Sequence, residues 1–137
     1  MSTEQIKQAN RRFYDEVLNK GNMAAVDELL AENYVSHALP PGLPQGREGI
    51  KMFIGAFRTG FPDGYINVDG QTVEGDKVVT RLTYRGTHTG VFNGIPPTGR
   101  QVQVPALDFA RYEKGMLVEH WGGPDQLSLP ARRRMRF

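Results

Sequence analysis

Two titratable side chains in the second half of the chain, Asp108 and His120, are the strongest candidates for chemistry. Alternate residues of an extended strand point to the same face of a sheet, so Asp108 shares a face with the small residues Ala106 and Ala110. A carboxylate among apolar neighbours loses hydration, which disfavours its charged form and suits it to proton transfer. Asp108 is therefore the predicted acid or base of a site walled by small side chains.

His120 is the second candidate, because imidazole gains and loses a proton near neutral pH and can pass it to or from Asp108. Each residue also has a structural alternative. Asp108 could pair with an arginine, such as Arg81, Arg85 or Arg111, or face solvent. His120 could be a packed core histidine with both ring nitrogens hydrogen-bonded.

Other chemistries have little support in the sequence. His37, His88 and His120 are separated by 51 and 32 residues, which is no compact metal-ligand spacing, and the chain has no cysteine. A Gly-x-Ser-x-Gly elbow and a dinucleotide fingerprint are both absent from the sequence. We therefore expect a reaction that needs neither a cofactor nor a metal ion.

The elements that would position these residues follow from hydrophobic periodicity. Helical spacing in the first half predicts a helix through Ile6 and Val17 that ends at Gly21, then a short helix capped by Asn22. A short extended segment at 34–37, a proline-rich loop and a third helix over 47–58 complete the first half.

Strand patterns fill the second half, at 65–73, 78–88, 100–112 and 116–121, and turn residues separate them. Helices followed by a meander of strands predict an α+β fold with the helices on one face of a mostly antiparallel sheet.

Length and composition predict a single domain over residues 1–128, followed by a basic tail over 129–137. Removing the four tail arginines lowers the formal charge from +2 to −2, so we expect no nucleic-acid binding. The chain has no apolar run long enough to span a bilayer and no signal-like start. A cytoplasmic protein without membrane contact is the expectation.

The second half also carries a series of landmarks whose order and spacing are specific in combination. They are Gly86-Thr87-His88, Gly94-Ile95-Pro96-Pro97-Thr98-Gly99, Arg111, Gly115 and Glu119-His120-Trp121, with Asp125 four residues after Trp121. Over about residues 5–127 the chain resembles the SnoaL-like polyketide cyclases, also called SnoaL-like ester cyclases.

This resemblance implies a nuclear-transport-factor-like cone, in which a strongly curved sheet wraps the N-terminal helices around a deep apolar pocket. It also implies a homodimer through the outer face of the sheet. Asp108 would take the position of a pocket histidine in the aldol cyclases of the family, and Gly122 the position of their catalytic aspartate. The chain departs from the family pattern at that second position.

The predicted function is a cofactor-independent cyclase or isomerase that acts on a hydrophobic, polyketide-like carbonyl substrate, with Asp108 and His120 as catalytic residues. Three alternatives remain: a cyclase that works by shape and promotes cycloaddition, an epoxide-opening or hydroxylating enzyme, and a non-catalytic module that binds a small ligand. The predicted substrate-binding residues are His37, Phe61, His88, Phe92, Ile95, Ala106, Trp121 and Gly122.

Overall fold

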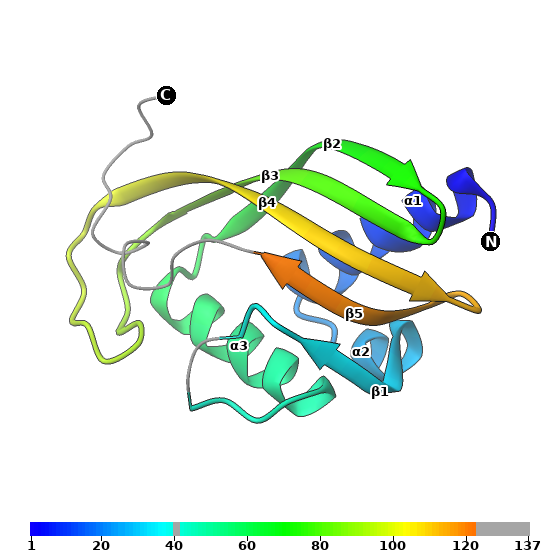
Figure 1. The fold of residues 1–137 in the computed structure, drawn as a ribbon. Helices are drawn as coiled ribbons and strands as arrows, with labels where there is room; N and C mark the ends of the chain where they lie inside the picture. The colour runs from blue at the N-terminus through cyan, green and yellow to red at the C-terminus, as the bar shows by residue number, and fades with distance from the viewer. Residues whose placement is uncertain (40–41, 123–137) are drawn as a thin grey trace.

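The computed structural model describes residues 1–39 and 42–122, which form helices and strands in the predicted order (Figure 1). The helical elements are α1 (Thr3–Arg12), the π-helical turn η1 (Phe13–Asn19), α2 (Met23–Leu29) and α3 (Arg47–Gly60). The strands are β1 (Leu30–Ser36), β2 (Tyr65–Glu74), β3 (Lys77–Thr87), β4 (Gln101–Glu113) and β5 (Met116–Gly122).

The five strands form one sheet in the order β1-β5-β4-β3-β2. The pairs β2–β3, β3–β4 and β4–β5 are antiparallel, whereas β1 runs parallel to β5. The helices lie along one face of this twisted sheet (Figure 1). The predicted α+β fold is therefore confirmed.

The first helix begins with a capping box in which Ser2 and Gln5 satisfy each other's backbone N–H groups. It continues without a break into η1, where the helix widens to π-helical geometry. Phe13 and Tyr14, which are adjacent in sequence, are both buried there, as are Val17 and Leu18 one turn later. These two pairs of side chains lie one turn apart, so they share the face of the helix that packs into the interior.

The long strand β4 separates the two faces of the sheet as its alternation predicts. Val104 and Ala110 on its inner face are buried against the helices. Leu107 and Phe109 on its outer face are 55% and 46% exposed. The core therefore lies between the helices and the inner face, and Asp108 belongs to that face. Among the described residues, no helix is long and apolar enough to cross a membrane.

Candidate active site

Asp108 lies at the centre of the inner face of the sheet and is 1% exposed. It is held there by strands on both sides, since it pairs with Thr80 on β3 and with Gly122 on β5. A carboxylate so far from bulk water requires polar partners, because burial of an unpaired charge is costly.

The first partner is Tyr14, whose hydroxyl group donates a hydrogen bond of 2.5 Å to Oδ2 of Asp108. The π-helical turn η1 brings this tyrosine inward, and the side chain is fully buried. Burial raises the pKa of Tyr14 well above its ordinary value, and the charge of Asp108 raises it further. Tyr14 therefore stays protonated and acts as a donor to the carboxylate.

The second partner is His120, whose Nε2 lies 3.1 Å from the same oxygen of Asp108. Neither ring nitrogen of His120 makes a hydrogen bond to a described residue, and the ring is 8% exposed. The imidazole can therefore form an ion pair with Asp108 when it is protonated, and it retains unused hydrogen-bonding capacity. Oδ1 of Asp108 also lacks a hydrogen-bond partner among the described residues.

The arginine alternatives for Asp108 are not realised. Arg81 donates to the backbone oxygen of Asp69, and Arg111 pairs with Glu113 and Glu119 on the outer face. The partners of Asp108 are instead Tyr14 and His120. The tyrosine hydroxyl group brings no full positive charge to Asp108, whereas an arginine ion pair would. The carboxylate therefore remains available as a base.

Asp108 and His120 line one apolar cavity. Its remaining walls come from the helices, from the end of β1 and from β3, and they are Phe13, Leu18, Ser36, Ala38, Leu39, Ile50, Phe53 and Tyr84. The volume open to the centres of water-sized molecules is about 30 Å³. That space suits about two water molecules. The two predicted catalytic residues therefore converge on a real but narrow cavity.

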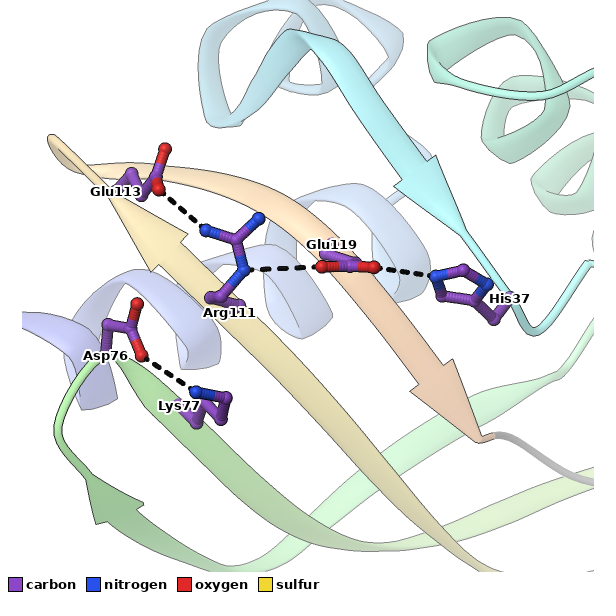
Figure 2. A network of polar contacts seen from close by, with 6 residues as sticks. All are labelled: His37, Asp76, Lys77, Arg111, Glu113 and Glu119. Atoms are coloured by element: carbon purple, nitrogen blue, oxygen red, sulfur yellow. Dashed lines mark hydrogen bonds and ion pairs between the residues drawn. The ribbon is translucent and has the colours of Figure 1, made fainter.

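Two predicted substrate-binding residues, His37 and Trp121, lie on the outer side of the sheet. Their rings stack with centroids 5.2 Å apart and planes 15° apart. Nε2 of His37 lies 2.7 Å from Oε2 of Glu119, whose other oxygen contacts Arg111 at 3.3 Å (Figure 2). The next residues after His37, Ala38 and Leu39, line the cavity. The substrate-binding role of His37 and Trp121 stays a prediction.

A second group of predicted binding residues forms an aromatic cluster apart from the cavity walls. Phe61 is fully buried and stacks on His88 at 5.3 Å, and Phe92 meets Phe61 edge-on at 5.3 Å. Nδ1 of His88 accepts a hydrogen bond from the backbone N–H of Thr98, which closes the loop between β3 and β4. Phe92 also forms a short bridge with Ile95 within that loop. These contacts stabilise the loop, and the substrate-binding role of these residues stays a prediction.

Ala106 packs against the margin of the core and also borders an open groove with Leu107, while the cavity lies elsewhere. Gly122 is exposed at the end of β5 and has a φ of +99°. A Cβ atom at this position would lie 2.2 Å from the backbone oxygen of Leu107. The backbone found here therefore excludes a side chain at the position where the resemblance expects an aspartate.

Two further sequence predictions, Asp125 and the basic tail over 129–137, lie outside the described residues. Within the described part of the chain, no group of three or more histidine and carboxylate side chains is placed to hold a metal ion. Tyr14 and Tyr84 are site residues that the sequence analysis missed. Both belong to apolar patterns in which a tyrosine is indistinguishable from a packed core residue.

The described residues thus form a small α+β protein in which helices and one face of a sheet enclose an apolar cavity. The chain belongs to the SnoaL-like polyketide cyclase family, whose model matches residues 8–132. No functionally curated protein matches the sequence.

Solved structures support the same assignment. IdmH from Streptomyces antibioticus, described as a candidate polyketide cyclase, is 34% identical with a TM-score of 0.79, over 93% of this chain and 96% of that one. TsrD from Streptomyces laurentii is 29% identical with a TM-score of 0.84, over 96% of each chain. A candidate polyketide cyclase from Bacillus cereus is 29% identical with a TM-score of 0.82, over 96% of this chain and 84% of that one.

Proposed function

We propose that this protein is a cofactor-independent cyclase or isomerase that moves a proton on a hydrophobic, polyketide-like carbonyl substrate. Asp108 is the general base, and His120 carries the proton to or from it. The observation that carries this proposal is the convergence of Asp108 and His120 on one apolar cavity.

The two oxygens of Asp108 have different surroundings, and this difference assigns the base. Oδ2 accepts the hydrogen bond of Tyr14 and lies beside Nε2 of His120. Oδ1 has no partner among the described residues. In the proposed reaction Oδ1 removes a proton from the carbon next to the substrate carbonyl, while Tyr14 and His120 hold Oδ2 in place. The electron pair of the broken C–H bond passes to the carbonyl oxygen as an enolate.

The apolar walls favour the hydrophobic body of such a substrate. Aliphatic and aromatic side chains such as Phe13, Leu39 and Phe53 surround the acid/base pair. Exclusion of water strengthens electrostatic interactions inside the cavity and protects the enolate from early protonation. A ring-sized substrate exceeds the present volume, so its binding requires lining side chains to move apart.

The proposal is tested by the rate at which the protein exchanges the α-protons of 2-tetralone, an apolar bicyclic ketone, for deuterium in D₂O. We expect the wild type to accelerate exchange and Asp108→Asn to reduce it by about 10²–10⁴-fold, the usual contribution of one general base. Asp76→Asn is the matched control, because Asp76 lies on an exposed turn, where its carboxylate pairs with Lys77 (Figure 2). Equal exchange by wild type and Asp108→Asn contradicts the assignment of the base.

The pH dependence separates this mechanism from a shape-driven one. A base that must be ionised makes the exchange rate fall on the acid side, whereas a cyclase that only folds its substrate gives a rate nearly independent of pH between about 5 and 8. Binding of 2-tetralone without any exchange would instead favour a ligand-binding module.

We also propose that two copies of the chain pair through the outer face of the sheet. Leu107 and Phe109 are exposed there, and Phe109 lies opposite Trp121 in the β4–β5 register. Exposed large apolar side chains that lie side by side are more typical of an interface than of a free surface. Since the cavity opens on the other face, pairing leaves the site intact.

A further inference from the structure

We propose that the hydroxyl group of Tyr84 is the hydrogen-bond donor to the substrate's carbonyl oxygen and therefore a third catalytic residue. This inference rests on the proposed function, because it assigns the group that receives the charge that proton removal creates.

Tyr84 belongs to the same inner face and the same cavity as Asp108. It lies on β3, where it pairs with Val104 of β4, and Asp108 pairs with Thr80 of β3 four residues away. Tyr84 is 4% exposed and lines the cavity. The edge of its ring meets Phe57 of α3, with centroids 5.9 Å apart and planes 87° apart. The ring is therefore held between sheet and helix.

The ring of Tyr84 contacts Phe57, and no hydrogen bond joins its hydroxyl group to another described residue. A tyrosine hydroxyl group usually finds a partner when it is buried. Tyr14 differs, because its hydroxyl group already donates to Asp108. Tyr84 thus offers a hydrogen-bond donor on the wall of an apolar cavity. A carbonyl oxygen is the acceptor that the proposed substrate would supply.

The protonation state of Tyr84 suits this role. Burial raises the pKa of Tyr84 well above its ordinary value, and the charge of Asp108 raises it further. The hydroxyl group therefore keeps its proton through neutral pH and remains a donor. When Asp108 takes the substrate proton, negative charge moves from the carboxylate to the enolate oxygen, and a donor that lines the same cavity stabilises the product side of the step.

Ser36 is the competing donor, since it also lines the cavity. Its Oγ accepts a hydrogen bond from the backbone N–H of Ala38 at 3.1 Å, and its own N–H and C=O groups are bonded to Gln45. These bonds give Ser36 a role in shaping the end of β1. We therefore assign the oxygen to Tyr84, and the experiment compares both residues.

Two measurements on Tyr84→Phe test the assignment, and the variant retains the packed ring. In the exchange of 2-tetralone protons, removal of one oxyanion donor lowers the rate by about 10²–10³-fold. In a fluorescence titration, 2-naphthol serves as a planar analogue of the 2-tetralone enol. We expect the wild type to bind it and Tyr84→Phe to bind it at least about 10-fold more weakly, the factor that 1.4 kcal/mol represents.

One variant serves as the control and one as the comparison. Tyr65→Phe removes the hydroxyl group of a tyrosine that is 48% exposed on β2, and it should exchange 2-tetralone protons and bind 2-naphthol within about 3-fold of the wild type, the usual spread of small context effects. Ser36→Ala removes the competing donor, and its losses in both measurements should be smaller than those of Tyr84→Phe.

The outcomes separate this inference from the proposed function. If Tyr84→Phe matches the wild type in both measurements, or if Ser36→Ala causes the losses, the assignment of Tyr84 is wrong. Failure of the wild type to bind 2-naphthol also overturns it. If the wild type binds 2-naphthol through Tyr84 but exchanges no proton, the proposed acid/base function fails while Tyr84 is retained as the oxygen-binding group.

Discussion

Gly122 lies directly opposite Asp108 in the β4–β5 ladder, and its missing side chain permits the two strands to approach. A Cβ atom on Gly122 would come within 2.2 Å of the backbone oxygen of Leu107 and 3.1 Å of Cα of Asp108. Its φ of +99° is also a conformation that L residues with side chains avoid. Gly122 thus allows β5 to pair closely with β4 and helps to fix the position of Asp108.

This relationship predicts that Gly122→Ala destabilises the protein and displaces Asp108. Positive φ alone costs about 1–3 kcal/mol, and the clash with Leu107 adds to it. Gly115→Ala is the matched control, since Gly115 has a φ of +84° with open space around its Cβ position. Urea denaturation should show a larger loss of unfolding free energy for Gly122→Ala than for Gly115→Ala. Equal losses of unfolding free energy in the two variants would mean that β5 shifts away from β4 to accommodate the new side chain without further cost.

The hydrogen bond from Tyr14 to Asp108 predicts a coupled effect of Tyr14→Phe on stability and on catalysis. A hydrogen bond to a charged group contributes about 1.5–3 kcal/mol. The variant should lose about that much stability at neutral pH. Because the bond holds the carboxylate that acts as the proposed base, its loss should also lower the exchange rate of 2-tetralone protons.

Tyr112→Phe is the comparison for that experiment. Tyr112 is also buried, but its hydroxyl group donates to the neutral side chain of Asn10 at 3.0 Å. It should lose only about 0.5–1.5 kcal/mol and leave the exchange rate unchanged. A lowered exchange rate in Tyr112→Phe, or an unchanged one in Tyr14→Phe, would contradict the role given to Tyr14.

The contacts of Glu119 with His37 and Arg111 on the outer face of the sheet predict that stability changes at acid pH (Figure 2). Its hydrogen bond with His37, followed by that with Arg111, lowers the pKa of Glu119 below the ordinary value of 4.5. The folded state thus binds its proton less readily than the unfolded state does. The resulting stabilisation is present above about pH 4.5 and is lost as the pH falls through the lower folded value.

Urea midpoints measured from pH 3 to 6 should therefore fall less steeply on the acid side in Glu119→Gln than in the wild type. Glu74→Gln, at the exposed end of β2, should retain the wild-type slope. If the urea midpoint falls with the same slope in all three proteins, Glu119 does not contribute to the loss of stability at acid pH.

The proposed pairing of two copies predicts that Leu107→Lys yields a monomer. The substitution places a charge on the exposed apolar strip of β4, where a facing copy would have to bury it. Light scattering after size exclusion measures the mass directly. Met52→Lys, on α3 and 50% exposed, changes the same kind of side chain away from the sheet and should leave the mass unchanged. A monomeric wild type would end the proposal.

The order and type of the elements could be predicted from local pattern. Asn22 caps α2 by accepting from Ala25 N–H, as a residue of this type before a helical run should. The alternation along β4 placed Asp108 inside and Phe109 outside, because a strand has a period of two. Residues whose roles follow from one element could therefore be assigned without coordinates.

Three features of the site depend on contacts between distant segments. Tyr14 and Asp108 are 94 residues apart, and no local pattern distinguishes a tyrosine that meets a carboxylate from one that packs in the core. The π-helical geometry of η1, which carries Tyr14, likewise has no signal in the helical spacing of the sequence. The third such feature is that the partners of Asp108 are a tyrosine and a histidine, and not an arginine.

The sequence by itself determined the α+β order of elements and the inward face of β4, and it predicted Asp108 and His120 as the residues most suited to proton transfer. Those properties depend on periodicity and side-chain chemistry, which are local. Only the tertiary structure decided which groups surround Asp108, how narrow the cavity is, and that His37 lies outside it. Those properties depend on the register of β1, β4 and β5 and on the position of α1 and η1 over the sheet, which arise when the whole core packs together.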